Sequence, residues 1–221
     1  MREAAAAPPG EAEIGPNAVL QTMRVIETRL GAGAGAAILA EAGLARLPDG
    51  TGMIREADAI ALHRAIARRF PHEAEAIARA SGAATADYII AHRIPAPAKA
   101  LLRLLPAALA APLLMAAIRQ HAWTFVGAGR FTPAGGWAFT IDRAAARDDP
   151  APPPSLFTWY GAVFTRLFRK LVSARAECRV VACERDGLAR RYRIGRAGRA
   201  FPAPFAVSRR GRPDESGMTA P

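Results

Sequence analysis

Cysteine and histidine are scarce in this chain of 221 residues. There are two cysteines, Cys178 and Cys183, and the 4 histidines lack the close spacing that a metal site requires. A zinc site needs about four closely placed ligands and an iron–sulfur cluster needs a set of cysteines, so the sequence predicts neither. Because an odd number of positions separates the two cysteines in an expected strand, they should point to opposite faces and stay free thiols.

Motifs of the common enzyme classes are also absent. The sequence contains no Walker loop, no G-x-S-x-G elbow, no HExxH helix and no paired Cys-His signature. The glycine-rich run from Gly31 to Leu39 follows no strand and lacks the last glycine of the dinucleotide-binding fingerprint. We interpret it as a helix with a small face that ends near Gly43. No cofactor-binding motif is evident, and whether the chain is an enzyme stays open.

Lysine is almost missing. The formal net charge of +11 comes from arginine, since Lys99 and Lys170 are the only lysines. Arginine together with abundant alanine is typical of GC-rich coding, and most of the arginines are scattered along the chain, so we predict no nucleic-acid partner. An anionic partner stays open, whether a carboxylated small molecule, a membrane surface or an acidic protein.

Long uncharged segments are missing too. The N-terminal stretch contains three glutamates and no continuous apolar segment, so it does not resemble a secretory signal and we expect a cytoplasmic protein. The uncharged run 104–118 contains Pro106 and Pro112 and is shorter than the roughly 20 residues that span a bilayer. We predict that residues 101–118 form a buried, kinked helix. The alternative is an interfacial segment that lies peripherally on the inner membrane.

Apolar periodicity divides the rest of the chain into helices followed by strands. The pattern predicts helices at 17–30, 31–43, 56–70, 72–80 and 85–93, with an interruption at Ser81 and Gly82. It predicts four antiparallel strands near 123–128, 137–142, 175–183 and 188–194. Ser155 is a natural N-cap for an aromatic helix between the second and third strands. The expected fold class is therefore α+β, with this helix packed on the sheet.

Composition also predicts the domain boundaries. Residues 1–15 are poor in large apolar groups and should form a disordered arm. Residues 16–197 should form a single domain, with a helical part at 16–121 and a sheet part at 122–197. Residues 198–221 are rich in Arg, Pro, Gly and Ser and should form a flexible basic tail.

Polar and aromatic residues gather where the expected helices pass into strands, between Ala117 and Phe131. Arg119, His121 and Trp123 stand there close in sequence, at a joint where side chains can converge on a cleft. We take this stretch as the first candidate for a site. The alternative is that the aromatic residues belong to the core and that His121 merely ends a helix.

Four motifs resemble those of one family: TADYIIAHRIP (85–95), LLRLLP (101–106), AIRQHAWTFVGAGRF (117–131) and WYGAVFTRLFRKLV (159–172). The chain is similar, over about residues 17–194, to the bacteriochlorophyll-biosynthesis J protein family, traditionally named 4-vinyl reductase. The resemblance implies a mixed α/β ligand-binding domain related to the small subunits of TRAPP vesicle-tethering complexes. Where that family often has a C-x-W-H stretch, this sequence has FTWY (157–160), which puts a cysteine- or histidine-based site there in doubt.

The resemblance implies functions of different classes. One is an enzyme that reduces the vinyl group of a chlorophyllide-type tetrapyrrole. Another is a carrier that holds a divinyl chlorophyllide or protochlorophyllide and presents it to other bacteriochlorophyll biosynthesis enzymes. Since no motif would hold a hydride or electron source, we favour the carrier. A dimeric TRAPP-like adaptor, in which the chain pairs with a second copy, is a third interpretation.

A magnesium tetrapyrrole would need an axial ligand, a partner for its carboxylate and an apolar cover. We predict His121 as the axial ligand and Arg93 or Arg119 as the carboxylate partner. The remaining predicted ligand-binding residues are aromatic: Trp123, Phe125, Trp137, Trp159 and Tyr160.

Overall fold

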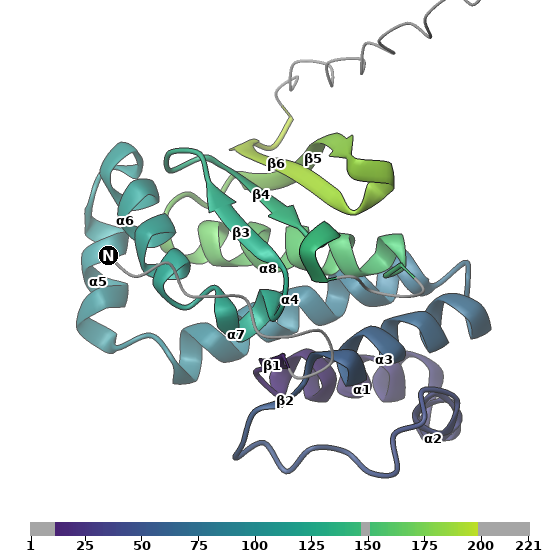
Figure 1. Cartoon of the computed structure of the whole chain (residues 1–221). Coiled ribbons are helices and arrows are strands. Elements are labelled where there is room, and N and C mark those ends of the chain that lie inside the picture. Colours follow the sequence, from purple (N-terminus) through teal and green to yellow (C-terminus); the bar gives the residue numbers. More distant parts are fainter. Residues whose placement is uncertain (1–11, 147–150, 199–221) are drawn as a thin grey trace, which may run out of the picture.

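Helix α8 (Pro154–Leu171) lies at the centre of the molecule, between a sheet and a group of helices. The computed structural model describes residues 12–146 and 151–198. In Figure 1 the layers follow one another from top to bottom as sheet, α8, α4 and then α1 with α3. A helix covered on both sides must be apolar around most of its circumference. This explains why α8 buries aromatic residues on both its sheet side and its helical side.

The predicted α+β class is confirmed. The helical half contains α1 (Asn17–Leu30), α2 (Ala32–Glu41), α3 (Glu56–Arg69), α4 (Ala74–His92), α5 (Ala96–Leu104), α6 (Ala107–Gln120) and α7 (Trp123–Val126). The sheet half contains β3 (Arg130–Pro133), β4 (Ala138–Asp142), β5 (Ala176–Glu184) and β6 (Ala189–Arg196), with short 3-10 turns at Ala144–Ala146 and Arg185–Gly187.

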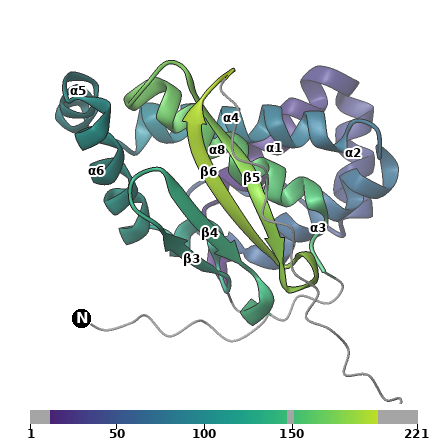
Figure 2. The same cartoon turned by 90° about the horizontal axis from the view of Figure 1, so that it is seen from above.

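The four strands are antiparallel and lie in the order β3-β4-β6-β5. Figure 2 shows α8 running beneath this sheet. Phe139, Ile141 and Tyr192 are fully buried on the side of the sheet that faces α8. Arg191 and Arg193 alternate with the buried positions of β6 and are exposed. The alternation of buried and exposed residues is the period-2 pattern of a sheet that is half covered.

Helix α4 runs without a break through Ser81 and Gly82, so the predicted interruption is wrong. A Cβ added at Gly82 would lie 2.5 Å from the carbonyl oxygen of Trp159 and 2.8 Å from the Cβ of Ala162, both in α8. The glycine therefore does not end the helix. It lets the backbones of α4 and α8 approach each other closely, which a larger residue would prevent.

The stretch Trp123–Val126 is a short helix, α7, and not the predicted first strand. That strand begins later, at Arg130. A short apolar run fits a strand and a helical turn equally well, and tertiary contacts decide between them. Here Phe125 contacts the rings of Phe131, Tyr160 and Phe164, with centroid distances of 5.7, 6.2 and 6.2 Å.

The segment 101–118 is two helices, not one buried, kinked helix. Pro106 is the N-cap residue of α6, and Leu105 before it is extended. Leucines on both helices are exposed, with 84% of Leu104 and 59% of Leu109 accessible to solvent. No helix of the described part of the chain is long and apolar enough to cross a membrane.

The predicted disordered arm, residues 1–15, extends too far toward the C-terminus. Glu13 and Ile14 form strand β1, which pairs with β2 (Ile54–Arg55) in a separate two-stranded sheet. Ile14 is buried, and Gly15 N donates a hydrogen bond to Thr124 O at 2.8 Å. Residues 1–11 and most of the predicted tail, 199–221, lie outside the described residues, so those expectations stay predictions.

Cys178 and Cys183 are free thiols, as predicted, but for a different reason. A β-bulge between Val180 and Ala182 shifts the register of β5 on β6. The cysteines therefore pair with Ile194 and Arg190, which are an even number of positions apart and share one face of β6. Roughly 13 Å of strand still separates the two thiols, beyond the about 7 Å between Cα atoms that a disulfide can bridge.

Candidate functional site

The predicted tetrapyrrole site divides into exposed and buried residues. His121 is the C-cap residue of α6 and is exposed, as is Arg119 in the last turn of that helix. Arg93 caps α4 and is also exposed. Trp123, in α7, is 56% accessible to solvent. Along the chain, Arg93 precedes the α5–α6 segment, and the other three residues lie at or just after its end.

The other predicted residues belong to the core. Trp159 and Tyr160 are buried in α8, and their ring centroids are 5.3 Å apart. Trp137 packs on Phe168 at 5.8 Å, and Phe125 packs on Tyr160. In the described residues, no ring contact or hydrogen bond joins the side chain of His121 or Arg119 to this aromatic group. The structure thus brings the predicted aromatic residues other than Trp123 together and leaves the predicted polar ligands on the surface.

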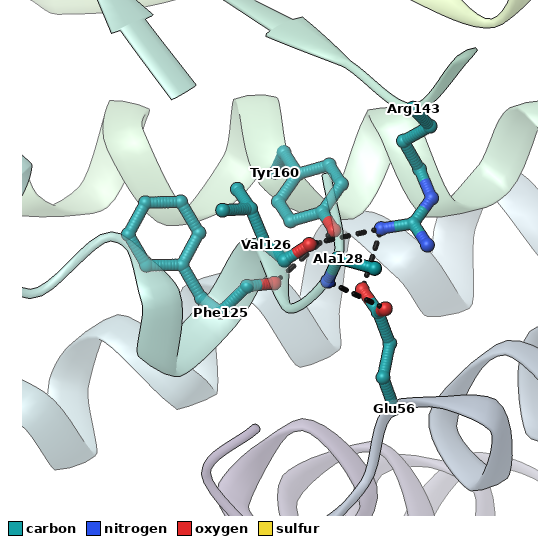
Figure 3. A network of polar contacts seen from close by, with 6 residues as sticks. All are labelled: Glu56, Phe125, Val126, Ala128, Arg143 and Tyr160. Atoms are coloured by element: carbon teal, nitrogen blue, oxygen red, sulfur yellow. Dashed lines mark hydrogen bonds and ion pairs between the residues drawn. The ribbon is translucent and has the colours of Figure 1, made fainter. Parts of the chain in front are cut away.

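A buried ion pair, which the sequence did not reveal, joins the helical half to the sheet half. Arg143 Nη1 lies 2.6 Å from Glu56 Oε1, and the two side chains are 0% and 8% exposed. Figure 3 shows both side chains pointing at the loop that follows α7. The same arginine nitrogen donates to Val126 O at 3.2 Å, and Ala128 N donates to Glu56 Oε2 at 3.0 Å.

Gly127 allows this network to close. Its φ of 50° is in the left-handed region, and an added Cβ would lie 2.3 Å from the carboxyl carbon of Glu56. Tyr160 completes the arrangement by donating its hydroxyl proton to Phe125 O at 3.2 Å (Figure 3). Each buried charge has an opposite charge and a backbone group as partners, as buried charges require. The network therefore fixes the α7 loop between α3 and β4.

A small cavity lies beside this network. It is lined by Glu56, His63, Phe125, Trp159 and Tyr160 together with apolar residues of β1, α1, α3 and α8. Burial lowers the pKa of His63 from 6.5 to about 4, so the imidazole is neutral near pH 7. The cavity has a volume of about 10 Å³, which is enough for about one water molecule.

This cavity is far smaller than the pockets of about 300–1,000 Å³ that hold cofactors and drug-sized ligands. Trp159 lines the cavity, and its Nε1 is buried without a hydrogen-bond partner among the described atoms, as is Ser155 Oγ. A single bound water is the ligand that the space fits. In the described ranges 12–146 and 151–198, no group of three or more His, Cys, Asp or Glu side chains could hold a metal ion.

An apolar surface lies on α5 and α6. We call it the α5–α6 face and define it by four leucines: Leu101, Leu104, Leu109 and Leu113, which are 49%, 84%, 59% and 43% exposed. Figures 1 and 2 place these helices at one end of the molecule, away from α1, α2 and α3. Four exposed leucines on two consecutive helices are typical of a surface that contacts another molecule.

Two curated relatives are similar to the chain over most of its length. The bacteriochlorophyll synthase 23 kDa chain of Rhodobacter capsulatus is 44% identical over 186 residues, which are 83% of this chain and 87% of the relative. The protein of the same name from Cereibacter sphaeroides is 41% identical over 172 residues, 77% of this chain and 84% of the relative. No protein-family model matches the sequence.

Solved structures with a similar fold are H-NOX proteins. The Fe(II) unliganded H-NOX protein from K. algicida has a TM-score of 0.53 at 9% identity, covering 85% of this chain and 99% of that one. A mutant of the T. Tengcongensis H-NOX has a TM-score of 0.53 at 11% identity, covering 85% of this chain and 100% of that one. At such low identity the likeness shows a shared α+β fold alone.

The names of the two relatives correct the predicted function. They describe a chain of bacteriochlorophyll synthase, and neither name matches the 4-vinyl reductase family that the motifs indicated. The prediction of a vinyl reductase, or of a carrier or accessory factor for vinyl reduction, is therefore wrong. The first and the last of the four motifs lie in fold-forming segments, since Thr85, Ala86 and Ile90 of α4 and most of α8 are buried. The motifs correctly indicated the fold class and bacteriochlorophyll biosynthesis, but they did not identify the reaction.

Proposed function

The chain belongs to the family of the bacteriochlorophyll synthase 23 kDa chain, and from this we infer that it acts in bacteriochlorophyll biosynthesis as a subunit of that synthase. Its partners in this proposal are the other protein chains of the synthase. The observation that carries the proposal is the 44% identity to the Rhodobacter capsulatus protein over 83% of this chain. The mass of 23.4 kDa agrees with the size in the relative's name.

The packing of the interior supports a role that is exercised through the surface. The described cavity has room for about one water, and its charged neighbours Glu56 and Arg143 are already paired with each other. By contrast, the α5–α6 face and the exposed residues around it are accessible. A subunit that contributes contacts to an assembly needs such a surface and does not need an internal pocket.

The tetrapyrrole site around His121 stays a separate proposal. His121 and Arg119 are exposed at the end of α6, where a pigment held by a neighbouring subunit could reach an imidazole and a guanidinium. Trp137, Trp159 and Tyr160 pack in or against the core. The aromatic cover of the pigment would therefore have to come from another chain. Pigment content of the purified assembly tests this site, because His121→Ala should lower the bound pigment without dissociating the subunits.

A deletion strain tests the proposed function. Removing the gene from a pigment-forming bacterium should lower its bacteriochlorophyll content and leave tetrapyrrole precursors in the extract, measured by absorption and chromatography. Supplying the wild-type gene on a plasmid should restore the pigment. A deletion strain that makes bacteriochlorophyll at the normal rate under every growth condition contradicts a role of this chain in the synthase.

A further inference from the structure

The side of α6 that faces solvent carries almost only apolar side chains. A helix at the surface of a soluble domain is normally polar on that side. Here the first exposed polar residue, Arg119, comes in the last turn. The exposed positions before it are Ala108, Leu109, Pro112, Leu113, Ala116 and Ala117.

The opposite side of α6 is apolar as well, because Ala110, Ala111, Leu114 and Met115 are buried against the protein. A helix that is apolar around its whole circumference is normally covered on both sides. Helix α5 adds two more exposed leucines, Leu101 and Leu104. The α5–α6 face therefore has the composition of a contact surface, and in this structure it faces solvent.

The segment that contains this face carries charges of one sign. From Tyr88 to Ile141 the sequence contains no aspartate and no glutamate. Arg93, Arg103 and Arg119 are exposed, and within the described ranges no ion pair links any of them to a carboxylate. Arg103 Nε donates to the carbonyl oxygen of Lys170 at 3.2 Å, which places the exposed end of α8 beside α5. Unpaired basic groups that border an apolar face favour an anionic partner.

We propose that the α5–α6 face docks into the surface of a membrane that contains anionic lipid. The leucines would enter the boundary between headgroups and acyl chains, while the arginines stay at the level of the phosphates. A protein partner is less well matched, because a protein interface carries about one hydrogen bond per 100–200 Å² and the exposed side of α6 offers no polar side chain before Arg119. With 9 and 14 residues, α5 and α6 are too short to span the bilayer, so they lie on it.

Vesicle flotation with the purified full-length chain tests the proposal. The wild-type protein should float with vesicles of phosphatidylcholine and phosphatidylglycerol, and much less with phosphatidylcholine alone. Raising the salt concentration should weaken the binding, since salt screens the attraction between arginine and phosphate. The double variant Leu104→Asp/Leu109→Asp should bind the anionic vesicles at least about tenfold more weakly.

Leu47→Asp is the matched control. Leu47 is also an exposed leucine, at 37%, but lies in the segment between α2 and β2 and not on α5 or α6, so its replacement should leave binding unchanged. A second pair compares Arg103→Gln/Arg119→Gln, which should weaken binding, with Arg24→Gln in α1, which should not. Circular dichroism verifies that each variant is folded, as expected for changes of exposed side chains.

Two results overturn the proposal: a wild-type chain that ignores anionic vesicles, or a leucine double variant that floats as well as the wild type. A wild-type chain that ignores vesicles but forms a dimer, or binds a synthase subunit, through Leu104 and Leu109 identifies the face as a protein interface and likewise rejects the membrane. The assay uses this chain alone, so its outcome is independent of membership in the synthase.

Discussion

At the scale of single residues, the ion pair between Glu56 and Arg143 is the most consequential contact. Sequence patterns could not reveal it, because the two residues are 87 positions apart and each has an ordinary local explanation. Glu56 begins a helix, where an acidic residue complements the dipole. Arg143 follows a strand near a loop. Only the fold brings them together at 2.6 Å in a site that excludes solvent.

The first prediction concerns this pair. Glu56→Gln should destabilise the folded chain by about 3–5 kcal/mol, because Arg143 would remain buried without its counter-charge. Urea unfolding followed by circular dichroism measures the change. Glu41→Gln is the control: its partner Arg68 lies 3.0 Å away but is 58% exposed, and exposed pairs contribute about 0–1 kcal/mol. Equal losses in the two variants would show that burial of the first pair does not matter.

The second prediction concerns His63, whose pKa is lowered by burial from 6.5 to about 4. The unfolded chain takes up a proton as the pH falls through 6.5, and the folded chain does so only near 4. Stability is therefore lost as the pH falls from about 6.5 to about 4, by up to about 3 kcal/mol from this group. The loss over this window should be smaller in a folded His63→Leu variant when unfolding is measured at both ends. Parallel pH profiles for the two proteins would mean that His63 is not shielded from solvent.

For several of the predicted site residues, the sequence indicated the correct element but not whether the side chain is buried or exposed. Trp159 and Tyr160 were placed correctly in an amphipathic helix, yet they were assigned to a ligand when they pack in the core. His121 and Arg119 were placed correctly at a helix end, and that end is exposed. Aromatic residues give the same sequence pattern in a core as in a ligand pocket, so the sequence could not distinguish core residues from pocket residues.

At the scale of elements, periodicity located the long helices and the strands well and failed where tertiary contacts decide. The clear errors are the predicted interruption of α4, the predicted strand where α7 lies and the predicted single helix over 101–118. In α4 a glycine that normally interrupts a helix is needed for the approach of α8. In α7 an apolar run of four residues gave no usable period. The bulge in β5 likewise has no signature in the sequence.

The third prediction tests the close approach of α4 and α8. Gly82→Ala should destabilise the chain by about 1–3 kcal/mol, although alanine is the better helix former, because the new methyl group would overlap the backbone of α8. Gly33→Ala in α2 is the control, since a Cβ there meets nothing within 4 Å, and should be neutral or slightly stabilising. Thermal unfolding of both variants measures the difference. A Gly82→Ala variant that is as stable as Gly33→Ala would mean that the two helices can separate without cost.

At the scale of the whole molecule, the fold class followed from the sequence and the function did not. Helices followed by an antiparallel sheet could be predicted from the order of periodic segments. The reaction could not, because an α+β fold hosts many functions and the motifs that carried the family resemblance build the fold. The exposed side of α6 was the informative departure: an apolar segment that should have been buried is open to solvent.

The central claim is that this chain is a subunit of bacteriochlorophyll synthase, and affinity purification tests it most directly. A tagged copy, expressed at its natural level in a pigment-forming bacterium, is purified in mild detergent, and the bound proteins are identified by mass spectrometry. An equally tagged soluble enzyme of the same host is the control. The account predicts that the other chains of the synthase co-purify with this chain and are absent from the control. Recovery of the tagged chain without any of them, from cells that are making bacteriochlorophyll, would contradict the claim.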